Sequence, residues 1–296
     1  MGTRGIFDYF TYLWLELIIC FVMMFIRWNV EPVAFKVLGV PIMYYSLLFI
    51  AGTVLSVWIL KRVYERNGMP WEHLQVLVVL SLVGLFLGAR IGHCLIYEYD
   101  YYWKHPLEIF LPVRELPGGG YVFSGYEGMA SHGGALGWIV ALVIYSRVTR
   151  EKIIRTLDAI ALVLPLAACF IRLGNLVNSE IVGSGTSVPW AFVFERVDGV
   201  PRHPAQLYEA MAYLAIFGGN MLLYRRVGLR RYPGMLWGGM LVTVFSARFL
   251  LEFLKERQVS FEEQMSLDLG QVLSIPFIFA GMLFLLFAWR VSRGNG

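Results

Sequence analysis

The fold of this chain is decided by long apolar runs, of which the clearest is LQVLVVLSLVGLFLGARIGHCLIYE at residues 74–98. A helix rises about 1.5 Å per residue, so about 20 apolar residues cross the hydrocarbon core of a bilayer. Within this run only Arg90 and Glu98 carry a full charge. The run therefore predicts a helix that crosses a membrane.

The whole sequence has the composition of a membrane protein. Of its 296 residues, 58% are hydrophobic and 16% are charged, and the mean hydropathy is +0.62. Soluble domains carry about 25% charged residues. We therefore expect an all-α polytopic membrane protein with seven core transmembrane helices. Their expected ranges are 43–60, 74–98, 129–146, 157–175, 206–223, 235–253 and 270–289.

A further apolar run, from Tyr9 to Ile26, precedes these seven and contains Glu16. The residues that follow it, 27–29, do not form the small-residue cleavage site of a secretory signal. We expect an extra N-terminal helix, which either spans the membrane or lies in its interface. The expected domains are an N-terminal extension over residues 1–30 and a transmembrane domain over residues 31–296.

The distribution of basic residues predicts the orientation, because short cytoplasmic loops are rich in Lys and Arg. The loops after the first, third and fifth expected spans, together with the C-terminal tail, hold more basic residues than the alternate loops. We expect these segments, including the C-terminus, to be cytoplasmic. Their basic residues are Lys61, Arg62, Arg66, Arg147, Arg150, Lys152, Arg155, Arg225, Arg226, Arg230, Arg231, Arg290 and Arg293.

Charge and cysteine usage argue against several classes of function. The formal net charge of +4 follows from the basic cytoplasmic loops, so it gives no reason to expect a nucleic-acid partner. The three cysteines, Cys20, Cys94 and Cys169, stand singly in separate apolar runs. This spacing is not that of a metal or redox site. We expect no metal and no cofactor.

Polar side chains gather near the outer end of six of the expected spans. Charged residues inside a membrane are costly and commonly mark functional sites. Their shared depth predicts a single site toward the outer face of the membrane. Glycines four residues apart, at 84, 88 and 92 and again at 133 and 137, indicate close helix packing beside it. The polar residues include Tyr45, Arg90, His132, Arg172, Asn175, Asn178, Glu180, His203, Gln206, Arg248 and Glu252.

Several guanidinium groups at this depth suit a phosphate, because the planar group pairs with two oxygens and stays charged. A histidine beside them suits a general base. Each residue also has a structural interpretation. Arg248 and Glu252 are spaced to neutralise each other on one helix, and Arg172 with Asn175 is spaced to bridge helices. Arg90 is placed to reach headgroup phosphate, and His132 to pack through a hydrogen bond.

Residues 172–183, RLGNLVNSEIVG, resemble the signature of bacterial prolipoprotein diacylglyceryl transferases. That signature reads Gly-Arg-x-Gly-Asn-Phe-x-Asn-x-Glu-x-x-Gly. The resemblance continues over most of the chain from Glu31 onward. It includes Tyr44-Tyr45, Gly88-Ala89-Arg90-Ile91-Gly92, Ser131-His132-Gly133-Gly134, His203-Pro204-Ala205-Gln206-Leu207-Tyr208-Glu209, Arg248 with Glu252-Phe253, and Gly270-Gln271-Val272-Leu273-Ser274-Ile275-Pro276.

The resemblance implies an enzyme of the bacterial inner membrane that begins lipoprotein maturation. It would move the diacylglyceryl group of phosphatidylglycerol onto the lipobox cysteine beside the signal peptide of a prolipoprotein. We expect His132 to act as base with Tyr45 orienting it, and Arg172 and Arg248 to hold the phosphate. The expected catalytic residues are His132, Arg248 and Tyr45. The expected substrate-binding residues are Arg90, Arg172, Asn175, Asn178, Glu180, Gly183, His203, Gln206, Tyr208 and Glu252.

The sequence departs from the family pattern at three positions. Ile171 stands in place of Gly, Leu176 in place of Phe, and Val244 at a position where tyrosine is common. One alternative is therefore a diverged paralogue with another donor or acceptor. The alternative from a different class is a lipid or anion transporter, because intramembrane Arg and Glu also mark transport pathways. Against the transporter, the sequence shows no internal repeat, and its polar residues gather away from mid-membrane.

Overall fold

The computed structural model describes residues 25–116, 118–123, 125, 128–257 and 266–294. The expected N-terminal helix therefore lies outside the described residues, apart from its last two positions. The chain forms two compact units, residues 1–56 with 160–296 and residues 57–159. Each unit is described by itself, as the first and second unit.

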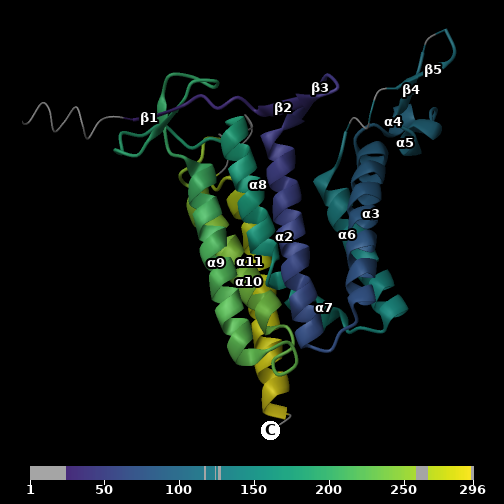
Figure 1. Ribbon diagram of the computed structural model, residues 1–296, viewed down its shortest axis with the longest axis vertical. Helices are drawn as coiled ribbons and strands as arrows, with labels where there is room; N and C mark the ends of the chain where they lie inside the picture. The colour runs from purple at the N-terminus through teal and green to yellow at the C-terminus, as the bar shows by residue number, and fades with distance from the viewer. Residues whose placement is uncertain (1–24, 117, 124, 126–127, 258–265, 295–296) are drawn as a thin grey trace, which may run out of the picture. The chain divides into compact units, whose positions relative to one another are not determined.

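The first unit is a helical bundle. Its main helices are α8 (Leu164–Asn178), α9 (Ala205–Val227), α10 (Met235–Glu252) and α11 (Leu269–Gly294), and α2 (Tyr44–Arg66) begins in it. Helix α9 packs between α8 and α10, and α10 packs along α11 (Figure 1). Small residues permit the closest of these contacts. A Cβ atom on Gly238 of α10 would lie 2.8 Å from the carbonyl oxygen of Gly281 on α11.

Short strands lie before α2 and between α8 and α9. Strands β1 (Ile26–Trp28), β6 (Phe192–Phe194) and β7 (Pro201–Arg202) form a sheet in the order β1-β6-β7, with β1 parallel to β6 and β7 antiparallel to it. Strands β2 (Val33–Val37) and β3 (Val40–Met43) form a hairpin. The expected all-α class thus describes the helical bulk of the chain but not these strands, which are too short for an alternating pattern to stand out.

The second unit is built on two helices, α3 (Trp71–Ile96) and α6 (Ser131–Thr149). Between them come α4 (Tyr99–Tyr102), α5 (Leu107–Phe110) and the hairpin of β4 (Val113–Glu115) and β5 (Tyr121–Phe123); α7 (Ile153–Ala161) follows α6. The expected close packing at the glycines is confirmed. A Cβ on Gly84 would lie 2.6 Å from the carbonyl oxygen of Gly137, and one on Gly92 would lie 2.7 Å from Cα of Gly133.

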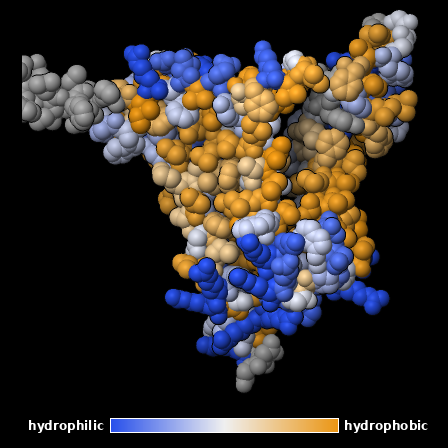
Figure 2. Space-filling view, viewed as in Figure 1, coloured by the Kyte–Doolittle hydropathy of each residue, from blue (hydrophilic) through white to orange (hydrophobic). Residues whose placement is uncertain are grey.

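Helices cover all seven of the segments expected to span a membrane, but not all are equally apolar. Among the described residues, α2, α3, α10 and α11 are long and apolar enough to cross a bilayer, and the bent pair α7 and α8 adds a fifth candidate. On the face shown in Figure 2, hydrophobic side chains cover the middle of the first-unit helices and hydrophilic ones gather at the ends. The chain is a multi-pass membrane protein.

Candidate active site

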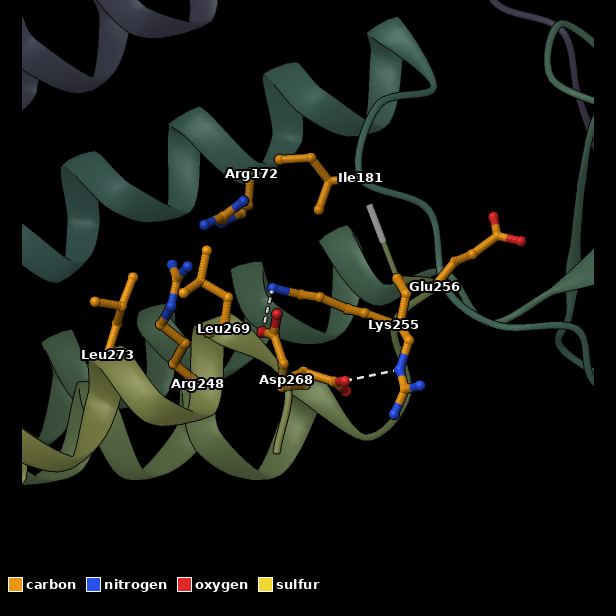
Figure 3. Close-up of a pocket in the computed structure, with 11 residues that line it drawn as sticks. Arg172, Ile181, Arg248, Lys255, Glu256, Asp268, Leu269 and Leu273 are labelled. Atoms are coloured by element: carbon orange, nitrogen blue, oxygen red, sulfur yellow. Dashed lines mark hydrogen bonds and ion pairs between the residues drawn. The ribbon is translucent and has the colours of Figure 1, made fainter. Parts of the chain in front are cut away.

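A polar cavity of about 140 Å³ opens in the first unit between α8, α10 and the start of α11. It brings together three residues singled out from the sequence, Arg172, Arg248 and Glu252. Figure 3 shows the guanidinium groups of Arg172 and Arg248 facing each other from α8 and α10. The other residues that line it are Ile181, Lys255, Glu256, Arg257, Asp268, Leu269, Gly270 and Leu273.

Arg172 is held by a buried carboxylate. Its Nε lies 3.0 Å from Oε2 of Glu209, whose side chain is fully buried on α9. A buried carboxylate is stable only when it is paired, because losing its water shell costs several kcal/mol. Glu209 therefore fixes the direction in which Arg172 points and leaves the rest of the guanidinium group to face the cavity.

Lys255 completes the pairing of Glu209. Its Nζ lies 2.9 Å from Oε1 of Glu209 and 3.0 Å from Oε2 of Glu252. The Lys255 side chain is 5% exposed. Arg172, Lys255, Glu209 and Glu252 thus form a buried network with no net charge. The chain reaches this arrangement because Glu252 is the last residue of α10 and Lys255 follows it by three residues.

Arg248 differs from the other three cations that line the cavity, Arg172, Lys255 and Arg257, each of which pairs with a carboxylate. Within the described residues it has no carboxylate partner and no hydrogen bond, and Glu252 pairs with Lys255 instead. The pairing of Arg248 with Glu252 that the sequence allowed is therefore absent. A guanidinium group that lines a cavity without an anionic partner provides a binding site for an anion.

The signature turn after α8 is held by its own side chains. The amide nitrogens of Asn175 and Asn178 donate to the two carboxylate oxygens of Glu180 at 3.0 and 3.1 Å. Gln206 Nε2 donates to the Glu180 carbonyl at 2.6 Å, and Arg172 donates to Oδ1 of Asn175 at 3.4 Å. These contacts favour the expectation that the polar residues fix the arginine.

Gly183 lies at a close crossing of three segments. Its N–H donates to the carbonyl of His203 at 3.0 Å, and a Cβ at this position would meet the carbonyls of His203 and Leu254. No side chain fits there. His203 in turn lies beside Tyr208, with 3.2 Å between Nδ1 and the phenol oxygen, and burial lowers the pKa of His203. None of these three residues lines the cavity.

Arg202 braces the same region, and sequence reasoning assigned it no role. Its guanidinium group pairs with Asp198 at 2.6 Å and with Glu256 at 2.8 Å, and it donates to the Gly183 carbonyl at 3.1 Å. Its hydrogen bonds to Asp198 hold the pKa of that carboxyl below its usual range. Arg202 therefore ties the turn at Gly183 to the cavity wall at Glu256.

Tyr45 stands at the start of α2, in the first unit, and packs against α8, the helix that contains the start of the signature at residues 172–178. A Cβ atom on Gly174 would lie 2.7 Å from the Tyr45 ring. The glycine thus makes room for the ring two residues after Arg172 on α8. Tyr45 does not itself line the cavity of the arginines.

His132 and Arg90 belong to the second unit. His132 is exposed at the start of α6, where it lines a cavity of about 390 Å³ with His93, Tyr97 and Gly128 among others. The pairing of His132 with the cations of the first unit stays a prediction. His93 was not identified from the sequence, because one histidine in an apolar run carries no spacing signal.

Arg90 is 4% exposed and is held by the protein itself. It donates to the Glu108 carbonyl at 2.6 Å, the Ile109 carbonyl at 3.2 Å and the Tyr102 hydroxyl at 3.2 Å. These contacts fasten the segment between α3 and α6. They support the structural interpretation of Arg90, while its binding to substrate stays a prediction.

One group of side chains has the composition of a metal site. His105, Glu108 and Glu115 of the second unit bring potential ligand atoms within 4.8 Å of one another. His105 pairs with Glu115 at 2.9 Å, and Glu108 accepts hydrogen bonds from Tyr101 and from the Glu115 N–H. The three residues thus pair with one another through ion pairs and hydrogen bonds.

Comparisons with known proteins agree on one family. The family described as prolipoprotein diacylglyceryl transferase matches residues 32–287. A relative named phosphatidylglycerol–prolipoprotein diacylglyceryl transferase, from Bacteroides fragilis, is 47% identical over 88% of this chain and 95% of its own length. Relatives with the same name from Chloroherpeton thalassium and Vibrio cholerae are 42% and 32% identical, over 88% and 90% of this chain and 92% and 93% of their own lengths.

Proposed function

The chain belongs to the prolipoprotein diacylglyceryl transferase family, and on that premise we propose that it transfers the diacylglyceryl group of phosphatidylglycerol to the lipobox cysteine of prolipoproteins. The geometric observation that supports the proposal is the cavity in which Arg248 faces Arg172 and has no carboxylate partner among the described residues. A phosphodiester is an anion that two such groups recognise.

The surrounding charges prepare this cavity for one phosphate. Arg172 forms an ion pair with Glu209 through its Nε, and Lys255 forms ion pairs with Glu209 and Glu252. Arg248 is then the cation that the lipid phosphate neutralises. Asn175, Asn178 and Glu180 stand next to Arg172 and offer partners for the hydroxyls of the headgroup glycerol. Arg90, Gly183, His203, Gln206 and Tyr208 complete the proposed binding region.

The transfer forms one bond and breaks another. The cysteine loses its proton, and its sulfur attacks the carbon of diacylglycerol that carries the phosphate. A thioether forms as the carbon–oxygen bond breaks, and glycerol phosphate leaves with the electrons of that bond. His132 takes the thiol proton, Tyr45 orients the reacting groups, and Arg172 and Arg248 stabilise the charge on the departing phosphate.

The basic loops and the apolar helices support the proposed setting. Seven helices cross the bacterial inner membrane, the C-terminus is cytoplasmic, and the site faces the outer leaflet, where lipoprotein signal peptides emerge. Residues 31–296 act together as the transferase domain. The partners are phosphatidylglycerol, the prolipoprotein signal peptide with its lipobox cysteine, and the bilayer.

The decisive experiment is transfer by the purified chain in vesicles that contain phosphatidylglycerol, with a synthetic lipobox peptide as acceptor. Mass spectrometry of the peptide is expected to show the added diacylglyceryl group, and a peptide with Ser in place of Cys is expected to remain unmodified. Phosphatidylcholine vesicles serve as a control for the donor. An unmodified Cys peptide, under conditions in which another family member transfers the group, would refute the proposed function.

A further inference from the structure

Strand β1 contacts the signature helix from a segment that precedes the family match, which begins at residue 32. The indole N–H of Trp28 donates to the carbonyl of Leu176, the third residue from the end of α8, at 2.9 Å. Backbone carbonyls in the last turn of a helix lack helical partners and are usually satisfied by other groups. Trp28 supplies such a group to α8.

The turn that follows α8 contains two unusual backbone conformations. Ser179 and Ile181 both have a φ of 57°, in the left-handed region that residues other than glycine rarely adopt. Residues in such conformations persist only where their surroundings hold them. Glu180 lies between them, and Ile181 forms part of the wall of the arginine cavity. The contacts that hold this turn therefore bear on the site.

Leu176 connects the strand to this turn. Its carbonyl accepts both the Trp28 indole N–H and the backbone N–H of Ser179, at 2.9 and 3.1 Å. The Trp28 ring also packs against Phe192, with 5.4 Å between ring centroids, on a buried cluster that includes Leu176 and Val182. One side chain thus contacts α8 and the cluster beneath the turn.

The strand holds Trp28 in place. Residues Ile26, Arg27 and Trp28 pair in parallel with Phe192, Val193 and Phe194 of β6. Ile26 donates its N–H to Ala191, and the Trp28 carbonyl accepts the N–H of Glu195 at 3.1 Å. The backbone of β1 is thereby anchored on both sides of the indole, so the ring has a fixed direction toward α8.

We propose that Trp28 is a positioning residue that acts through Leu176 to hold the turn of Ser179, Glu180 and Ile181 in its binding conformation. This inference rests on the proposed function, in which Asn175 and Glu180 contact the headgroup of phosphatidylglycerol. Loosening the turn weakens binding of the lipid. It leaves the chemical step and the binding of the acceptor peptide unchanged.

The test compares the full-length chain with Trp28→Phe, which keeps an aromatic ring and removes the N–H donor. The KM for phosphatidylglycerol is expected to rise about 2- to 10-fold, the factor that corresponds to one net hydrogen bond. The kcat and the KM for the lipobox peptide are expected to stay within about twofold. A purely structural role would lower the amount of active enzyme, and so kcat, without changing KM.

Hydrogen exchange provides a measurement that does not depend on activity. Trp28→Phe is expected to speed exchange of the Ser179 and Glu180 amides, while exchange in α10 stays unchanged. The matched control is Trp138→Phe, which removes the indole bond to Ser81 in the second unit and leaves exchange in residues 176–183 at the wild-type rate. Wild-type exchange at Ser179 and Glu180 in Trp28→Phe overturns the inference.

The two readouts separate this inference from the proposed function. If the wild-type chain transfers no diacylglyceryl group, the proposed function fails, and the exchange rates alone still test the contact between Trp28 and the turn. If the wild type is active and Trp28→Phe has an unchanged KM for phosphatidylglycerol, the positioning role fails while the proposed function stands.

Discussion

At the scale of single residues, the cations of the site differ in whether a carboxylate of the protein pairs with them. Arg172 and Lys255 are paired with Glu209, a carboxylate with no exposed surface. Arg248 lines the same cavity without a carboxylate partner among the described residues. Two arginines that look equivalent in the sequence therefore contribute differently to stability, although both face the proposed phosphate.

The variants Arg172→Ala and Arg248→Ala are expected to separate these contributions. Both should abolish diacylglyceryl transfer. Arg172→Ala should also lower the free energy of unfolding, by up to about 3 to 5 kcal/mol, because it removes one partner of a buried carboxylate. Arg248→Ala should change it by less than about 1 kcal/mol. Denaturant unfolding in detergent measures the difference, and equal losses of stability would contradict the assignment.

His203 gives the protein a dependence on pH. Burial lowers the pKa of His203, so the unfolded chain binds this proton more readily than the folded protein. Stability should therefore fall as the pH is lowered from about 6.5 toward the depressed pKa of the folded state. His203→Gln should flatten this part of the profile of unfolding temperature against pH. His105→Gln, at an exposed ion pair, is the control.

At the scale of elements, glycine decides how closely helices approach. In the second unit, α3 and α6 meet at glycines, and a Cβ on Gly88 would lie 2.8 Å from Cα of Gly137. The same principle holds α10 against α11 at Gly238 and Gly281. Helices in lipid associate through such close packing, because burial of apolar surface gives them little advantage there.

Gly88→Ala should therefore destabilise the second unit. The added methyl group has no space between the helices, and overpacking of this kind costs about 1 to 3 kcal/mol. The matched control is Gly218→Ala in α9, where no atom lies within 4 Å of the new Cβ. That change should be neutral or stabilise the helix by about 0.5 to 1 kcal/mol. Equal effects of the two substitutions on thermal unfolding would refute the packing argument.

At the scale of the whole molecule, the ends of the helices in the first unit differ in charge. The end of α9 carries Arg225 and Arg226 in its last turn. The segment before α9, at the other end of this helix, contains the exposed loop at Gly199. In the orientation proposed from the basic residues, the first of these ends is cytoplasmic. The proposed site, near the opposite ends of α8 and α10, would then face outward.

Labelling of single cysteines in intact cells tests this orientation. With Cys20 replaced by Ser, a cysteine at position 199 should react with an impermeant maleimide added outside. A cysteine at position 226 should react only after the inner membrane is opened. Cys94 and Cys169 are buried and serve as internal controls. The reverse pattern would place the C-terminus and the site on the other sides of the membrane.

The sequence by itself determined the membrane class, the family and the glycine contacts of α3 and α6, because hydrophobic runs, a long signature and a four-residue spacing are local patterns. It also identified Arg172, Arg248 and Glu252. It did not identify Glu209 and Lys255 as their partners, nor Trp28 as a contact of α8. Ion pairs depend on which helices pack together, and Glu252 lies four residues after Arg248 and three before Lys255, so the sequence allows either pair. Only the tertiary structure, by burying Glu209 beside Arg172 and Lys255, decided which cation of the cavity has no carboxylate partner among the described residues.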